Sequence, residues 1–298
     1  MKSIKLTDIN GQFTAKDDFD VVDEKFYDRI RDIKESIKKN RREKPIILVS
    51  GPSGSGKTTS AYILEKMLDD DGLETHTISL DNYFKTVNEC ERGKIDYESP
   101  NRVDGELLTE HIKRMIKGEK VDIPVFDFVN TRRSEATIPL SIKKDELVIF
   151  EGIHSLNPSV ISAPDEFTAK IYISVDTSVQ YGEDMLFAPE YIRLLRRIAR
   201  DKLHRGRDAA TTIGYFDSVK IGEKKYVEPF LYRADYNVDS FIGYEPCVYA
   251  DILKNELSQA VCVGKSNDIL ISLNKFLSCV DGVSKDLVSD KSLIREFI

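Results

Sequence analysis

Residues 51–58 have the types and the order needed to bind the phosphates of a nucleotide. They read GPSGSGKT and fit the signature G-x-x-x-x-G-K-[ST]. Glycines let backbone N–H groups curl around phosphate oxygens, and the start of a helix adds partial positive charge there. Lys57 would reach the β- and γ-phosphates, and the Thr58 hydroxyl would bind Mg²⁺. The residues that we expect to contact the nucleotide are Gly51, Ser53, Gly54, Ser55, Gly56, Lys57, Thr58 and Thr59.

Acidic residues follow three of the apolar segments that read as strands. Asp81 follows the segment 74–80, Glu151 follows the apolar run 147–150, and Asp176 follows 170–175. Phosphoryl transfer needs a carboxylate to hold a metal ion and, in a kinase, one to accept the proton of the attacking hydroxyl. We expect Asp81 and Glu151 to divide these tasks. Asp176, in Asp-Thr-Ser, reads better as a turn residue at a strand end.

A basic segment at residues 193–208 reads as a helix followed by a loop. Arg193, Arg196, Arg197 and Arg200 would share one broad face of the helix. A run of charges is usually a solvated face, but arginine suits phosphate oxygens and a triphosphate must be neutralised during transfer. We therefore interpret the segment as a lid that carries arginines to the phosphates and excludes water.

The elements that position these residues alternate between strands and helices. The apolar residues 45–50 predict a buried strand that leads into the loop, and residues 59–68 predict a helix that leaves it. Strands at 74–80, 147–150 and 170–175 and a helix at 105–117 continue the pattern. The alternation predicts an α/β fold, a parallel sheet flanked by helices, whose carboxyl edge binds ligands.

Two terminal segments flank this predicted domain at residues 45–240. Residues 1–44 read as a polar stretch, with a strand or hairpin near Asn10, followed by an amphipathic helix with apolar residues at three- and four-residue steps from Val22 to Ile37. Residues 241–298 read as a strand over 241–249, a helix near 252–260 and a C-terminal helix. We interpret both segments as extensions that pack on the central domain.

The composition limits the class of protein. A hydrophobic fraction of 41% supports a sizeable core, and the net charge of −7 argues against a general nucleic-acid or membrane-surface binder. No apolar run approaches the roughly 20 residues that span a bilayer. The four cysteines form no C-x-x-C pair and the start of the chain has no apolar signal segment, so we expect a cytoplasmic protein with reduced thiols. The four histidines lack metal-ligand spacing.

Six motifs in order resemble those of the uridine kinase family, within the phosphoribulokinase/uridine kinase group. They are GPSGSGKTT (51–59), SLDNYF (79–84), DYESPNRVD (96–104), PVFDFVNTRR (124–133), VIFEGI (148–153) and RLLRRIARDKLHRGRD (193–208). The resemblance spans roughly residues 45–240, and the end of the chain is similar to a bacterial nucleoside-kinase branch. It implies an ATP- and Mg²⁺-dependent kinase that acts on a small molecule and forms homo-oligomers.

The resemblance also implies individual roles. By position, Asp81 corresponds to the general base, and Thr58, Asp81 and Glu151 surround Mg²⁺. Arg200, Arg205 and Arg207 correspond to residues on the ATP phosphates, and Arg197 to one near the sugar of the acceptor. Glu98 stands where the family has an aspartate that binds ribose, with Asp96 as a competing candidate.

The departures from the family gather at the positions that read the base. These positions typically hold Tyr, Tyr, His and Gln, whereas this chain has Phe84, Phe126, Thr131 and Tyr215. A pocket that reads a base through hydrogen bonds discriminates strongly, because unpaired buried polar groups are costly. The phosphate machinery therefore predicts the reaction type, whereas the choice of acceptor differs from the pattern of the family.

The sequence favours a kinase that phosphorylates a primary hydroxyl. The 5′-OH of uridine or cytidine is the acceptor that the resemblance implies, and another nucleoside or a sugar alcohol is the alternative. A P-loop NTPase that acts through a partner is disfavoured, because the chain lacks N-K-x-D and Asp81 would have no acceptor hydroxyl. A regulatory protein that binds nucleotide without catalysis is disfavoured by the intact set of Lys57, Thr58, Asp81, Glu151 and Arg207.

Overall fold

The computed structural model describes residues 2–87, 95–128, 130–183, 185–262 and 267–298. Its centre is a five-stranded sheet in which every neighbouring pair is parallel. The strands, in spatial order, are β10 (Tyr236–Asp239), β7 (Thr168–Ser174), β2 (Ile46–Ser50), β6 (Leu147–Glu151) and β3 (Thr75–Ser79). The α/β fold with a parallel sheet that the sequence predicts is confirmed.

Alternate residues of the strands pack into two different cores. In β2, Ile47 and Val49 belong to one hydrophobic cluster, whereas Ile46 and Leu48 belong to the other. This alternation follows from the two-residue period of a strand, and it explains why a strand buried on both faces is apolar throughout. The sheet is therefore covered on both faces.

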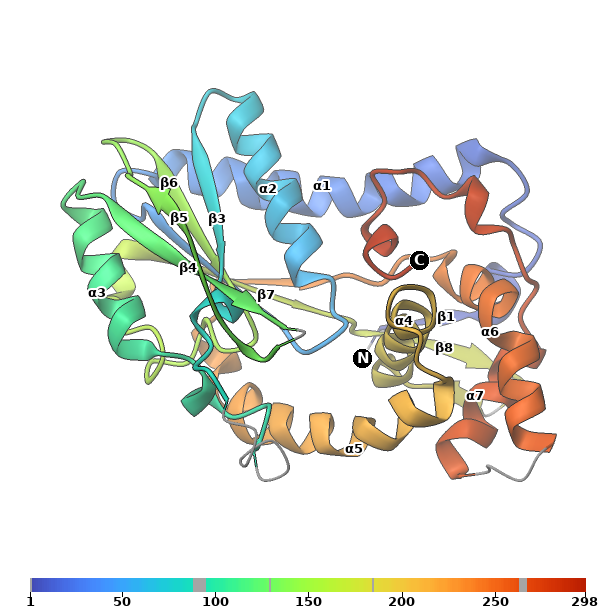
Figure 1. Ribbon diagram of the computed structural model, residues 1–298. Helices are drawn as coiled ribbons and strands as arrows, with labels where there is room; N and C mark the ends of the chain where they lie inside the picture. Colours follow the sequence, from blue (N-terminus) through green and yellow to red (C-terminus); the bar gives the residue numbers. More distant parts are fainter. Residues whose placement is uncertain (1, 88–94, 129, 184, 263–266) are drawn as a thin grey trace.

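Seven helices in the described residues surround the sheets (Figure 1). Figure 1 shows α3 at one end of the molecule and α4, α6 and α7 at the other, with α1 and α5 on opposite sides. None of the described helices combines the length and apolar character needed to cross a bilayer. The helices are α1 (Lys16–Asn40), α2 (Lys57–Asp70), α3 (Gly105–Ile116), α4 (Pro189–Arg205), α5 (Ala209–Tyr226), α6 (Glu245–Cys262) and α7 (Asp268–Ser278).

Two smaller sheets lie beside the central one. β1 (Lys2–Lys5) pairs in parallel with β8 (Thr177–Tyr181), which pairs antiparallel with β9 (Met185–Phe187). The start of the chain thus adds a strand to a distant segment instead of forming a hairpin near Asn10. β4 (Val121–Asp127) and β5 (Arg132–Leu140) form an antiparallel hairpin that carries the PVFDFVNTRR motif.

The prediction of a strand over residues 241–249 is wrong. The strand β10 ends at Asp239, and α6 begins at Glu245, so most of the expected strand is the first turns of a helix. Ile242, Tyr244 and Val248 are buried. A short apolar run buried on all sides lacks the period that separates a helix from a strand. The proline at position 246 suits the first turn of a helix, where its missing N–H costs nothing.

Candidate functional site

The phosphate-binding loop connects β2 to α2 at the carboxyl edge of the sheet. Gly54 and Gly56 have φ values of 76° and 81°, which favour glycine over other residues. A Cβ on Gly51 would lie 2.1 Å from the carbonyl oxygen of Ile173, so the strand β7 leaves no room for a side chain. The chain can therefore turn sharply here and place Lys57 at the start of α2.

Thr58 and Glu151 meet at the same edge. The Thr58 hydroxyl donates to Glu151 Oε2 at 3.1 Å, and Glu151 is buried as the last residue of β6. The register brings Glu151 beside Val49 of β2 and Ser79 of β3. Parallel pairing thus joins two residues that are 93 positions apart, as the sequence predicts for strands that end at one edge.

Asp81 lies in the turn of 3₁₀-helix (Leu80–Tyr83) that follows β3. Burial raises the pKa of its carboxyl to about 6, and the negative charge of Glu151 acts in the same direction. The positive charges of Lys57 and Arg200 oppose the shift. Asp81 is thus close enough to the phosphate loop and to α4 to interact electrostatically with both. A carboxyl with a pKa of about 6 is ionised at neutral pH and still basic enough to accept a proton.

Two arginines of α4 donate hydrogen bonds to backbone carbonyls of the phosphate loop. Arg193 forms a two-pronged pair with Glu223 at 2.8 and 2.9 Å and donates to the Ser53 carbonyl at 2.9 Å. Glu223 also accepts the Ser53 N–H at 3.0 Å. In the same manner, Arg196 pairs with Glu245 at 2.7 and 2.9 Å and donates to the carbonyl of Gly54 at 3.1 Å. These arginines act on the shape of the loop.

The next two arginines along α4 have no carboxylate partner among the described residues. The Arg197 guanidinium donates to the Ser53 hydroxyl, and the Nε atoms of Arg197 and Arg200 are buried without a hydrogen-bond acceptor. Burial, together with the positive charges of Arg205 and Arg197, lowers the pKa of Arg200 to about 10. Guanidinium groups that form no direct ion pair within the described residues and lie beside a phosphate loop are suited to an anionic ligand.

The last two arginines lie where α4 ends. Gly206 closes the helix in the left-handed conformation, with φ of 62°. Arg205 Nη1 lies 3.1 Å from Asp201 Oδ1, and Arg207 Nη1 lies 3.9 Å from Asp201 Oδ2. Both arginines are exposed, whereas Asp201 is buried. Asp201 therefore orients Arg205 and Arg207, and their role as lid residues stays a prediction.

Glu98 and Asp96 differ in their surroundings. Asp96 is exposed and accepts the Tyr226 hydroxyl at 2.8 Å. Burial raises the pKa of Glu98 to about 7, and the positive charge of Arg197 opposes the shift. A Cβ on Gly222 of α5 would lie 2.3 Å from the Glu98 Cβ, so the glycine makes room for this side chain. The arrangement favours Glu98 over Asp96 as the acidic residue that faces the site.

The positions expected to read a base do not all come together. Phe84 and Phe126 meet edge to face at 5.6 Å between ring centroids, and the guanidinium of Arg102 lies 5.2 and 5.9 Å from the same centroids. Thr131 lies at the β4–β5 turn with φ of 52°. Tyr215 is 59% exposed on α5, and its backbone carbonyl accepts the Ser218 hydroxyl of the same helix at 2.7 Å. The first two positions therefore form an aromatic cluster, whereas Tyr215 is an exposed residue of α5.

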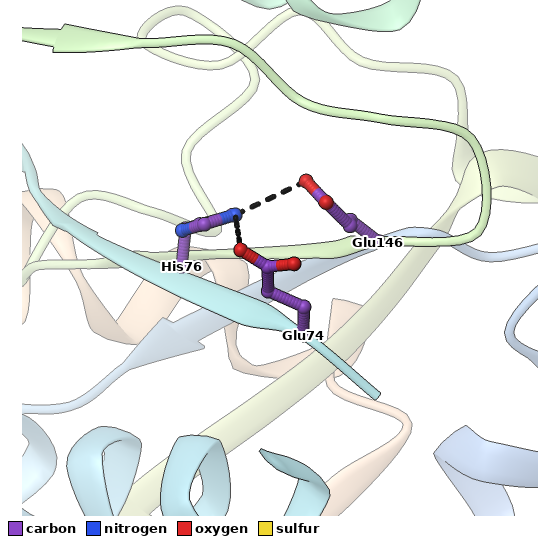
Figure 2. Close-up of side chains that lie close together, drawn as sticks. All are labelled: Glu74, His76 and Glu146. Carbon is purple, nitrogen blue, oxygen red and sulfur yellow. Dashed lines mark hydrogen bonds and ion pairs between the residues drawn. The ribbon is translucent and has the colours of Figure 1, made fainter. Parts of the chain in front are cut away.

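A second group of polar side chains lies at the opposite end of β3 and β6 (Figure 2). His76 Nε2 lies 3.2 Å from Glu146 and 4.0 Å from Glu74, an arrangement that metal ligands also adopt. Lys143 Nζ lies 3.1 Å from Glu146 and 3.5 Å from Glu74. A protein cation thus already neutralises these carboxylates. A cavity of about 560 Å³ next to Glu146 lies at this edge too, away from the phosphate loop.

The counter-ions of the arginines could not be located from the sequence. Glu223 and Glu245 lie 30 and 49 residues from their partners in α4. Another acidic residue, Glu296, contacts Thr59 from the end of the chain. Isolated glutamates on helices carry no local signal for such contacts. The tertiary packing of α4, α5 and α6 brings Glu223 and Glu245 to the loop.

Comparisons with known proteins agree with this geometry. The model of the phosphoribulokinase/uridine kinase family matches residues 46–243. The uridine kinase of Staphylococcus haemolyticus is 32% identical over 223 residues, which cover 72% of this chain and 96% of that protein. The uridine kinase of Macrococcus caseolyticus is 32% identical over 222 residues, or 73% of this chain and 98% of the relative.

Among solved structures, the fold is similar to that of a Silicibacter protein described as a candidate fructose transport system kinase. The TM-score is 0.55 at 16% identity, and the match covers 70% of this chain and 98% of the other. At that identity the likeness concerns the fold alone.

Proposed function

Because the chain belongs to the phosphoribulokinase/uridine kinase family and is a small-molecule kinase, we propose that it transfers the γ-phosphoryl group of ATP to a primary hydroxyl. The first candidate acceptor is the 5′-OH of a nucleoside, uridine or cytidine. The observation that carries the proposal is the place of Asp81, a carboxyl with a pKa of about 6 within the electrostatic reach of Lys57 and Arg200. This proximity supports a site in which a base acts beside the phosphate-binding cations.

The donor phosphates would lie in the loop between β2 and α2. The N–H groups at the start of α2 and the Lys57 ammonium bind the β- and γ-phosphates. Arg200, together with Arg205 and Arg207 beyond the end of α4, neutralises the charge that moves to the bridging oxygen as the phosphoryl group departs. Asp81 orients the acceptor hydroxyl and accepts its proton during attack on the γ-phosphorus.

The residues around Thr58 fit a magnesium ion. Thr58, Glu151 and Asp81 offer only oxygen atoms, which are the donors that Mg²⁺ prefers, and the first two already lie 3.1 Å apart. Bound there together with the nucleotide, Mg²⁺ would neutralise part of the phosphate charge. The protein holds the donor set in place by burying Glu151 at the end of a central strand.

Glu98 and Arg197 would bind the sugar of the acceptor. Glu98 lies within the electrostatic reach of Arg197 and Lys57, so it is near both α4 and the phosphate loop. A carboxylate can accept hydrogen bonds from two neighbouring hydroxyls, which is the pattern that a ribose offers. This position would keep the primary hydroxyl in line with the donor.

A second candidate acceptor follows from the aromatic cluster. Phe84 and Phe126 offer apolar surface where members of the family have hydroxyl-bearing side chains, and Arg102 lies beside them. Such a wall can stack on a flat ring but cannot read its edge by hydrogen bonds from those positions. The acceptor in this reading is a different nucleoside or a sugar alcohol.

Coupled ADP release against a panel of nucleosides and sugars tests the proposal. Turnover should require an acceptor and should be lost in Asp81→Ala. Turnover that is the same with every acceptor and without one would identify an NTPase. Nucleotide binding without any turnover would favour a regulatory protein.

A further inference from the structure

The end of the chain contacts the phosphate loop directly. The Thr59 hydroxyl donates to Glu296 Oε2 at 2.6 Å, and the Thr59 backbone N–H points to the same oxygen at 3.4 Å. Thr59 is the third residue of α2, so its N–H is one of the donors in the first turn that have no partner within the helix. In a phosphate-binding loop these donors serve the nucleotide.

The contact belongs to a segment that packs firmly against the loop. The segment Ser292–Ile298 includes a short 3₁₀-helix (Leu293–Glu296), and its residues Leu293 and Phe297 are buried. The methyl groups of Leu293 lie 2.9 Å from the place of a Cβ on Gly56. The ring of Phe297 lies 5.2 Å from the guanidinium of Arg196, which itself holds the loop. Glu296 is therefore held at the loop by its neighbours on both sides.

The same segment is tied to the N-terminal extension. Ser292 Oγ donates to Asp23 of α1 at 2.9 Å, and the Tyr244 hydroxyl lies 2.7 Å from both residues. Figure 1 shows the C-terminus close to α4 and α6, at the end of the molecule opposite α3. Both extensions thus hold the last seven residues in place, and Glu296 is the acidic residue that these contacts bring to Thr59.

A carboxylate and a phosphate would accept hydrogen bonds from the same donors of Thr59. Each is an oxyanion that accepts the N–H and the hydroxyl, and the positive end of α2 stabilises either one. The Glu296 carboxylate and a phosphate group cannot both bind Thr59. Two negative charges at such a short distance repel each other strongly in a partly buried site. We propose that Glu296 competes with the donor nucleotide for the start of α2 and so sets the affinity for ATP.

This inference rests on the proposed function, because it takes the loop as the donor site. When the nucleotide binds, the carboxylate must give up Thr59, and the free energy of that contact is subtracted from the free energy of binding. Glu296→Gln keeps the size of the side chain and removes its charge. The variant should bind ATP with a Kd about tenfold lower than that of the wild type.

Calorimetric titration of the full chain with ATP and Mg²⁺ measures this effect. Asp290→Asn is the matched control, because it removes one charge from the same end of the chain at a fully exposed residue whose ion pair is with Arg295. Its Kd should stay within twofold of the wild type. Glu296→Ala, which adds no new polar group, should change the Kd in the same direction as Glu296→Gln.

Thermal unfolding separates competition from a purely structural role. Without nucleotide, Glu296→Gln should unfold at a lower temperature than the wild type, since the charged hydrogen bond to Thr59 is lost. Its rise in Tm on addition of ATP should be larger than that of the wild type. A structural residue would lower Tm without enlarging the response to ATP.

The outcomes distinguish the two hypotheses. If the wild type, Asp290→Asn and Glu296→Gln bind ATP equally, or if Glu296→Gln binds it more weakly, the competition is refuted and the donor site stands. If neither the wild type nor any variant binds ATP, the donor site itself is wrong and the competition is wrong with it.

Discussion

Replacing Asp81 by asparagine should abolish the activity and at the same time stabilise the protein. Burial holds the pKa of Asp81 at about 6, against an ordinary value of 3.8. The difference of about two pKa units corresponds to about 3 kcal/mol at most, at about 1.4 kcal/mol per unit. Because the side chain is only partly buried, solvent screening reduces this value, and we expect about 1 to 2 kcal/mol.

The raised pKa of Asp81 decides how the stability of the wild type changes with pH. The carboxyl of Asp81 binds a proton more readily in the folded protein than in the unfolded chain, so protonation stabilises the fold. That stabilisation is fully present below pH 3.8 and is lost as the pH rises through about 6. Asparagine has no such dependence. The advantage of Asp81→Asn over the wild type should therefore be complete at pH 8 and fall by about half at pH 5.

Urea unfolding of both proteins at pH 8 and pH 5 measures the difference in the free energy of unfolding. The same substitution at Asp122, an exposed residue of β4, controls for the loss of a carboxylate in general. An Asp81→Asn variant that is no more stable than the wild type at pH 8 would refute the reasoning from burial. One that retains acceptor-dependent turnover would refute the role of Asp81 as a base, whose loss typically lowers rates by about 10²- to 10⁴-fold.

Three further predictions concern the surroundings of the site. The acid limb of the kcat/KM profile should have its midpoint near pH 6, because the base must be ionised; a midpoint below pH 5 would exclude Asp81. Arg196→Met should lower the free energy of unfolding by about 3 to 5 kcal/mol, because it leaves the charge of Glu245 buried without its cationic partner, and adding Glu245→Gln should restore part of it in urea unfolding. Gly222→Ala should displace Glu98 and raise the KM for the acceptor at least tenfold in steady-state assays, with the KM for ATP changed less than twofold; equal effects on both would contradict a role of Glu98 at the acceptor.

Four strands of the central sheet, β2, β3, β6 and β7, and the carboxylates at its edge could be predicted because local sequence encodes them. The apolar run before Gly51, the glycines of the loop and the acidic residue that ends β6 each have a direct physical reason at that position. Parallel pairing then brings Thr58 and Glu151 to one edge whatever their distance in the sequence. For these residues, secondary structure and topology are sufficient to bring the groups together.

The sequence could not show which arginines of α4 are paired with carboxylates and which are not. Arg193 and Arg197 look alike on a basic helix, yet the first is paired with Glu223 and the second is not. The difference arises from the packing of α5 on α4. The same limit explains Glu296, which reaches Thr59 only because the chain returns to the loop at its end.

Transfer of a labelled phosphoryl group shows directly whether the protein phosphorylates an acceptor. The protein is incubated with Mg²⁺, an acceptor from the panel and ATP that carries ¹⁸O in its terminal phosphoryl group, and the products are analysed by mass spectrometry. We expect the label to appear in a phosphate ester of the acceptor, and Asp81→Asn to form none of it. Label found only in inorganic phosphate, at the same rate with and without acceptor, would show that the protein is not a kinase of these acceptors.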